Sequence, residues 1–521
     1  MASSNSLILL VHSLTKSEKR YFTIYSSMQK GAKDYMRLFE LLEKNTDPRT
    51  VKKLFAKARP AASYESTSKY LYKVITDCLI HVRANQDKTT RLAMSLLKAN
   101  VLFEKSMPDE GFKELQKVQE AAEKNEEYFI LMWACRFEMY YLANLNFNNI
   151  SEKNLVHKQM RMDELLKYSK NIHQHTSLYE LLRHRLLFKG AARTRKQKED
   201  LNDLVFSELN IVAKAAAETV ESQKTHLLFQ SHYFISISDY RSALKAFYEL
   251  IDLLDENEYL WNDAEMDYLS TVEGILESLR MIRKYEEMDF FLEKLDNLLG
   301  RSVYLDVMVY RVGFIYRLSR LLDQGEFEEA VLLKDEYHDV LFKKIHLLDL
   351  NKQAELYLYT SLIYMSAGNI NRAHHFLSKV LLESKLFHAL PVYRTFRLLH
   401  LLVHYELGND EFIAYETRSF KRGLNASHSK TYLLEKLVLR FVQEKRVKRR
   451  SSVDGGVWKK VRKEFDTIRN DKYEIQILKI FDFESWIEAK LTNRPFKLIV
   501  REKFMQRREA DSEKIPARLA R

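Results

Sequence analysis

The sequence predicts an all-α protein built as a solenoid of stacked antiparallel helix pairs. The first observation is compositional: the 521 residues include 12 glycines and 6 prolines, too few for the many turns of an all-β protein. With 46% hydrophobic and 30% charged residues, the chain can still bury a large core. The second observation is a helical-hairpin pattern that recurs through the second half of the chain.

The hairpin pattern is clearest in LLDQGEFEEAVLL, which begins at Leu321. Gly325 permits the backbone turn at which one helix ends, Phe327 packs in that turn, and Ala330 lets the preceding helix approach closely. Three further copies place a turn residue and a close-approach residue in the same order: Tyr240 and Ala243, Tyr285 and Met288, and Gly368 and Ala373. Each copy predicts two antiparallel helices joined by a short elbow.

This order of large apolar, glycine, alanine and aromatic residues resembles the tetratricopeptide repeat, from about Thr225 to Gly423. The resemblance implies a right-handed solenoid with a protein-binding concave face. No copy ends in the family's proline, and the repeat is longer than the family's period of about 34 residues. The equivalent positions Ala243, Met288, Ala330, Ala373 and Ile413 are 45, 42, 43 and 40 residues apart. Longer helices or loops are therefore expected, in a stack that still buries the apolar faces.

The same resemblance implies a binding surface on the helix from Glu355 to Ala367. If that helix follows the family pattern, four side chains face the concave surface, where they contact an unknown protein or peptide: Glu355, Leu358, Leu362 and Met365.

The first half of the chain shows helix starts rather than clear repeats. Thr15 and Glu18 form a capping-box pattern, and Asp47 precedes a proline at the first position of another helix. Leu115, in a helix opened by a Met-Pro pair, lies 128 residues before Ala243, close to three repeat periods. We therefore expect an N-terminal helical region over 1–90, helical repeats over 91–440 and a basic C-terminal helical cap over 441–521, with polar connectors at 85–90 and 191–200.

The late segment FDFESWIEAKLTNRPF predicts an amphipathic helix that caps the open end of the stack. Four apolar side chains share one face of this helix: Ile480, Phe483, Ile487 and Leu491. The helix ends at an Asn-Arg-Pro sequence. Together with SLTKSEKRYF near the N-terminus, this segment resembles the two ends of uncharacterised bacterial helical-repeat proteins. That second resemblance implies no activity.

Motifs for nucleotide binding, serine or zinc hydrolysis, calcium binding and Cys-x-x-Cys chemistry are absent from the sequence, so neither an enzyme nor a cofactor is expected. Cys78 and Cys135 lie in apolar helical contexts, which favours reduced, buried thiols. No run is long enough to cross a bilayer, and the N-terminus lacks the basic region of a secretory signal, so a cytoplasmic location without a membrane partner is expected.

Among the histidines, His400 and His404 are the strongest metal candidates because they lie one helical turn apart. The repeat alignment places His404 at the apolar position of Leu321 and Tyr364, which favours packing, so no metal is expected. The pairs His173 with His175 and His374 with His375 are interpreted as solvated surface residues.

The net charge of +12 is concentrated at the C-terminal end, where residues 440–521 hold 23 Lys and Arg against 13 Asp and Glu. The clustered cations are Lys445, Arg446, Lys448, Arg449 and Arg450, followed by Lys459 and Lys460 beside Trp458. Such clusters suit a phosphate backbone, but we interpret them first as a solubilising loop and the polar face of a terminal helix; contact with an acidic protein surface is a further alternative. We expect a non-enzymatic protein-interaction scaffold; the alternative is a nucleic-acid-binding regulator that uses the basic region.

Overall fold

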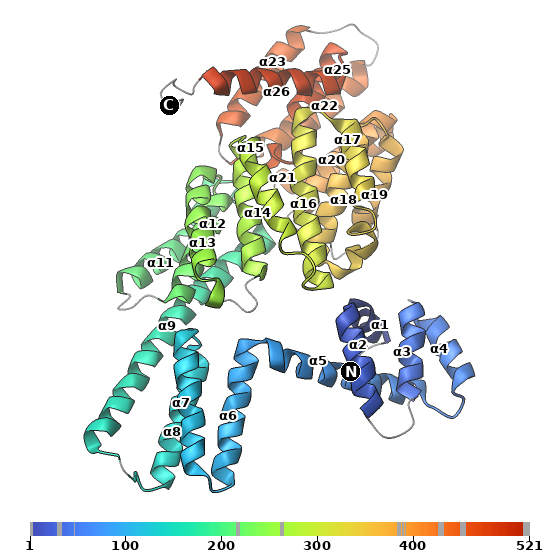
Figure 1. The fold of residues 1–521 in the computed structure, drawn as a ribbon. Helices are drawn as coiled ribbons and strands as arrows, with labels where there is room; N and C mark the ends of the chain where they lie inside the picture. Colours follow the sequence, from blue (N-terminus) through green and yellow to red (C-terminus); the bar gives the residue numbers. More distant parts are fainter. Residues whose placement is uncertain are drawn as a thin grey trace.

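The computed structural model describes residues 4–28, 34–45, 47–148, 150–214, 219–260, 265–382, 387, 390, 392–425, 432–448, 455–471 and 473–513. Within these ranges every regular element is a helix and there is no β-strand. The predicted all-α class is confirmed. Consecutive helices pack against one another along most of the chain, which is compatible with a helical-repeat fold (Figure 1). None of the described helices is long and apolar enough to cross a membrane.

The first five helices enclose a core of their own, centred on Leu38, Phe55 and Leu71. They are α1 (Ser4–Ser13), α2 (Lys16–Met28), α3 (Asp34–Lys44), α4 (Pro48–Ala58) and α5 (Tyr64–Gln86). Both predicted helix starts are confirmed. Glu18 N–H donates to Thr15 Oγ1 at 3.2 Å while Thr15 N–H donates to Glu18 Oε2 at 2.7 Å, and the Asp47 carboxylate accepts from the first amides of α4.

The next four helices form a second group around Leu96, Leu115 and Ala134. They are α6 (Lys88–Glu104), α7 (Pro108–Lys124), α8 (Tyr128–Asn144) and α9 (Glu152–Lys189). The predicted connector at 85–90 is reduced to Asp87, which caps α6. Helix α9 has 38 residues, about 57 Å at 1.5 Å per residue, and its second half enters the main core through Tyr179 and Leu182. It therefore joins the second group of helices to the main core.

The main core is built by five successive hairpins that follow two shorter helices, α10 (Arg195–Glu199) and α11 (Asn202–Lys214). The hairpins are α12 (Val220–Ser236) with α13 (Tyr240–Glu256), α14 (Glu265–Met281) with α15 (Tyr285–Asp296), α16 (Val303–Gln324) with α17 (Phe327–Glu336), α18 (Leu350–Ser366) with α19 (Ile370–Leu382), and α20 (Tyr393–Leu407) with α21 (Asp410–Asn425). Two short 3-10 helices, Glu258–Leu260 and Phe342–Leu347, lie between hairpins.

The elbows have the predicted geometry. Gly325, Gly368 and Gly408 lie in the left-handed backbone region, with φ of 76°, 79° and 73°, and the second helix begins two residues later. The close-approach residues Ala330 and Ala373 are 0% exposed. The small residues therefore mark places where two helices pack closely.

Elbows without glycine use the same left-handed step. Ser238 and Arg283 have φ of 62° and 65°, and the same step recurs earlier at Ser106 and Glu126, with φ of 60° and 52°. A residue with a side chain is strained in the left-handed backbone region, and the packing of the surrounding helices must offset that strain. The turn geometry therefore extends through α6, α7 and α8, where the sequence offers no glycine to mark it.

The C-terminal helices are α22 (Leu433–Lys448), α23 (Gly455–Asn470), α24 (Ile475–Leu478), α25 (Phe483–Thr492) and α26 (Phe496–Glu513). Helices α23, α25 and α26 lie together at the top of Figure 1. The predicted helix is α25, with Asn493 as its C-cap, and its predicted apolar residues Phe483, Ile487 and Leu491 are buried. Ile480 lies before the helix, and Glu484 and Ser485 are buried too, so the helix is covered on more than the predicted face. Trp486 of α25 packs against Tyr405 of α20.

The predicted polar connector at 191–200 is wrong in one important respect. Arg193 donates to Tyr473 O at 3.0 Å and to the buried carboxylates of Glu435 and Glu474 at 3.2 and 3.3 Å. The residue looks solvated in sequence because its partners lie more than 200 residues away. In the fold it ties the start of the main core to the C-terminal helices.

Candidate protein-binding surfaces

Helix α18 carries the four residues that the repeat resemblance assigns to protein binding. Leu358, Leu362 and Met365 are 2%, 1% and 7% exposed and belong to the main core. The Glu355 side chain is 33% exposed. Of the four, Glu355 is the most exposed, and the binding role of the set stays a prediction.

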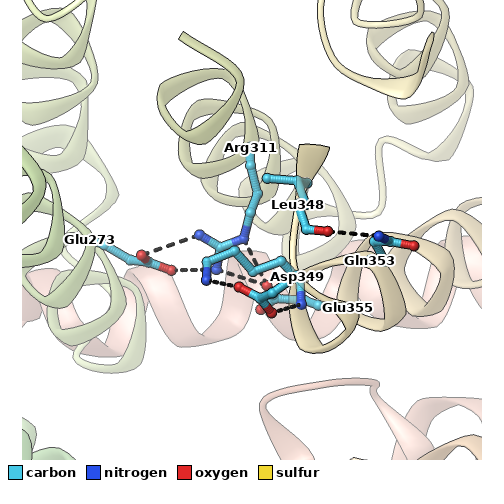
Figure 2. Close-up of polar contacts among 7 residues, drawn as sticks. Glu273, Arg311, Leu348, Asp349, Gln353 and Glu355 are labelled. Carbon is cyan, nitrogen blue, oxygen red and sulfur yellow. Dashed lines mark hydrogen bonds and ion pairs between the residues drawn. The ribbon is translucent and has the colours of Figure 1, made fainter. Parts of the chain in front are cut away.

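Glu355 belongs to an ion-pair network around the buried Arg311 (Figure 2). The network joins the first helices of three successive hairpins. Arg311 of α16 lies between Glu273 of α14 and Glu355 of α18. Its Nη2 donates to Glu273 at 2.7 Å and to Glu355 at 2.8 Å, and its Nε donates to Glu355 at 3.1 Å. The Arg311 side chain is 6% exposed. The network therefore links α14, α16 and α18 through one cation.

Burial and ion pairing have opposite effects on the pKa values in this network. Burial disfavours the charge on Arg311, but the attraction of Glu273 and Glu355 raises the pKa of Arg311 well above its ordinary value. Burial also raises the pKa of Glu355, although Arg311 acts against that effect. Removing Arg311 would leave two poorly solvated carboxylates facing each other.

Further polar contacts lie on α14 and α16, and one of them comes from the C-terminal part of the chain. Lys479, next to α24, donates to Glu277 of α14 at 2.5 Å. Arg280 of α14 donates to Asp323 of α16 at 2.9 Å, and Tyr285 OH donates to the same carboxylate at 3.1 Å. These groups satisfy one another within the molecule.

A surface that no sequence pattern had assigned lies on α6 and α8. On α6, Met94, Leu97 and Val101 are 54%, 49% and 50% exposed, on the side away from its buried residues. On α8, three aromatic residues are exposed: Phe129 at 69%, Trp133 at 43% and Tyr140 at 59%. We name these six residues the apolar face.

The two halves of the apolar face lie on neighbouring helices. Tyr141 of α8 stacks on Phe103 of α6 with ring centroids 3.7 Å apart, and its hydroxyl donates to Asn100 at 2.5 Å. Helices α6 and α8 run in the same direction, and α7 packs against both. From the helical rotation of each row relative to these contacts, we infer that both rows point away from α7. The sequence signal that could have indicated this surface is FILMWAC, Phe129 to Cys135, which places apolar residues on every side of α8.

The predicted polyanion-binding residues are described in part. Lys459 and Lys460 are exposed on α23. Lys445, Arg446 and Lys448 are in α22, but their side chains lie outside the described part of the structure, as do Arg449 and Arg450 altogether. The role of the seven residues stays a prediction.

Other cations of the C-terminal region pair with acidic residues near the hairpin elbows. Lys497 and Arg501 of α26 pair with Glu328 and Glu326 beside the Gly325 elbow. Lys490 of α25 pairs with Glu406, close to the Gly408 elbow, at 2.7 Å. Part of the charge asymmetry seen in the sequence is therefore an attraction between two parts of one chain.

In each of the two histidine pairs predicted to lie on the surface, one residue is exposed and the other is not. His173 and His375 are exposed as expected, but His175 is 4% exposed and bonds to Glu208 of α11 at 2.9 Å. His374 of α19 is half-buried because its ring packs against His400 of α20, with centroids 5.2 Å apart. Sequence neighbours on one helix thus face different surroundings.

Comparison with models of known protein families found no match, and comparison with curated proteins found none.

Proposed function

We propose that this chain is a non-enzymatic protein-interaction scaffold of the cytoplasm, built on a right-handed solenoid of the tetratricopeptide type. The observation that carries the proposal is the apolar face of α6 and α8. Scattered exposed apolar residues are ordinary on soluble proteins, but adjoining rows mark surfaces that another molecule covers.

The composition of the apolar face suits a protein partner. Trp133 and Tyr140 are of the residue types that dominate interface energetics, because they bury a large area with few rotatable bonds. Met94, Leu97 and Val101 supply an aliphatic surface beside them. The partner we propose presents an apolar helix or loop to this face.

The experiment is affinity purification from the cells that make the protein, with wild type and two triple variants. One variant removes the aromatic row: Phe129→Ser, Trp133→Ser and Tyr140→Ser. The control removes three scattered residues of similar exposure, Leu332 at 62%, Leu382 at 77% and Tyr415 at 64%, each replaced by Ser. A stoichiometric partner lost from the first variant and kept by the control supports the proposal. A partner kept by both variants contradicts it.

The second candidate function is nucleic-acid binding by the basic C-terminal region. Lys459 and Lys460 are exposed and follow the five-cation cluster of residues 445–450 in sequence. The same purification with a nuclease-treated arm separates the two functions. Recovery of nucleic acid, with partners that leave after nuclease treatment, favours this second function, whereas nuclease-resistant partners favour the scaffold.

A further inference from the structure

The histidines His374, His400 and His404 form a compact cluster between α19 and α20. Each offers a ring nitrogen, and these three atoms lie within 4.8 Å of one another. The Nε2 atoms of His400 and His404 are 3.0 Å apart. The sequence had indicated two of these residues; the packing of α19 on α20 adds the third.

The burial of the pair on α20 needs an explanation. His400 and His404 are 7% and 6% exposed, and the ring of Phe412 stacks on His404 with centroids 3.8 Å apart. The repeat positions equivalent to His404 are apolar: Phe234, Leu279, Leu321 and Tyr364. The Nδ1 atom of His404 is buried without a hydrogen-bond partner among the described residues. The atom of His404 that faces His400 is Nε2, so the unpaired Nδ1 does not face His400. What suggests a ligand is a buried polar ring at an apolar repeat position, with two further imidazoles beside it.

A second cluster, His175, Glu208 and His226, differs from the first because it contains a carboxylate. Glu208 Oε1 lies 2.9 Å from His175 Nδ1 and 2.6 Å from His226 Nδ1, and His226 Nε2 lies 2.9 Å from Gln230 Nε2. Both ring nitrogens that face Glu208 are paired with the same oxygen, Oε1, while Oε2 is buried without a hydrogen-bond partner among the described residues. The cluster on α19 and α20 contains no carboxylate, and its one internal hydrogen bond joins the Nε2 atoms of His400 and His404.

We propose that His374, His400 and His404 form a zinc site that links α19 to α20. Imidazole nitrogens suit Zn²⁺, which binds them at about 2.0–2.1 Å in tetrahedral geometry, so that ligand nitrogens lie about 3.3 Å apart. The separation of 3.0 Å between His400 and His404 is close to that value. Three protein ligands leave the fourth position of a tetrahedral site for a water molecule.

The experiment uses the full chain, Co²⁺ as the spectroscopic probe and Zn²⁺ as competitor. The variants are His374→Ala, at a half-buried position, and His404→Leu, which restores the residue type of Leu321 in the equivalent repeat position. The matched control is His375→Ala, an exposed histidine next to His374 on the same helix. Circular dichroism verifies the fold of each variant.

Wild type and His375→Ala are expected to bind one equivalent of Co²⁺ with visible absorption that Zn²⁺ removes, and Zn²⁺ should raise their thermal midpoint. His374→Ala and His404→Leu should bind Zn²⁺ more than about tenfold more weakly, without that rise. Two outcomes overturn the proposal. One is the absence of saturable binding; the other is binding that persists in both variants. A further variant, His226→Ala, is measured in that case, and a loss of binding there would place the ion at the second cluster.

Discussion

The residue that shapes each elbow is the one in the left-handed backbone region. Gly325 and Gly368 adopt this conformation with nearly equal φ, but their surroundings differ. A Cβ added at Gly368 would meet nothing within 4 Å, whereas at Gly325 it would lie 2.9 Å from Arg501 Cγ and 3.3 Å from Lys497 O. Gly325 therefore serves two purposes, the turn and the approach of α26.

This difference predicts unequal effects of one substitution. Gly368→Ala should destabilise by about 1 kcal/mol, because only backbone strain opposes it. Gly325→Ala should lower the unfolding midpoint further, since the new methyl group also displaces α26. Urea unfolding of both variants measures the difference. Equal losses would show that α26 does not pack on this elbow.

The close-approach residues give a second prediction. Ala373 is 0% exposed, so Ala373→Leu should crowd α19 against its neighbours and destabilise by about 1–3 kcal/mol. The control is His375→Leu, which adds a similar side chain at an exposed position two residues away. Thermal unfolding compares them. A melting curve unchanged by Ala373→Leu would mean that the helix register is wrong.

At the scale of elements, the C-terminal helices are held to the hairpins by contacts of two kinds. Phe496 of α26 stacks on Phe327 with ring centroids 5.3 Å apart, and Lys497 and Arg501 pair with Glu328 and Glu326. The aromatic contact supplies buried apolar area, and the charges favour one register of α26 over the elbow.

Reversing the two cations tests this attachment. Exposed ion pairs contribute about 0.2–1 kcal/mol each, and Lys497→Glu with Arg501→Glu replaces attraction by repulsion. Amide hydrogen exchange in α26 should become faster, and adding Glu326→Lys with Glu328→Lys should restore it. The difference should shrink at high salt. Exchange that is unaffected by the reversal would assign the attachment to apolar packing alone.

At the scale of the whole molecule, the uneven charge sets where a polyanion would bind. The C-terminal 82 residues, 440–521, carry +10 of the net +12, and some of these cations are used in pairs with the hairpins. The cluster Lys445–Arg450 and the exposed Lys459 and Lys460 are the candidates for external binding.

A salt titration tests the nucleic-acid function. If about five phosphates of a single strand are neutralised, the logarithm of the binding constant should fall with the logarithm of salt at a slope of roughly −3.5. Deleting residues 445–450 should reduce both affinity and slope while leaving the circular dichroism spectrum intact. Binding that is flat with salt, or unchanged by the deletion, would exclude this function for the basic cluster.

What the sequence by itself determined is the local order of the fold. The scarcity of glycine and proline predicted helices, Thr15 and Asp47 marked helix starts, and Gly325, Gly368 and their alanines marked elbows. These features depend on interactions between residues three to nine positions apart, such as caps, turns and one face of a helix. Their signals are therefore complete within a short stretch of chain.

The tertiary structure alone decided which distant groups meet. The bond from Arg193 to Glu435 spans 242 residues, and His374 reaches His400 because α19 packs on α20. The exposed aromatic row on α8, Phe129, Trp133 and Tyr140, is likewise recognised only when the neighbouring helices are placed. An apolar helix can be buried on every side or on one side only, and the sequence does not distinguish the two. Such contacts depend on the position and rotation of whole helices, which local patterns do not encode.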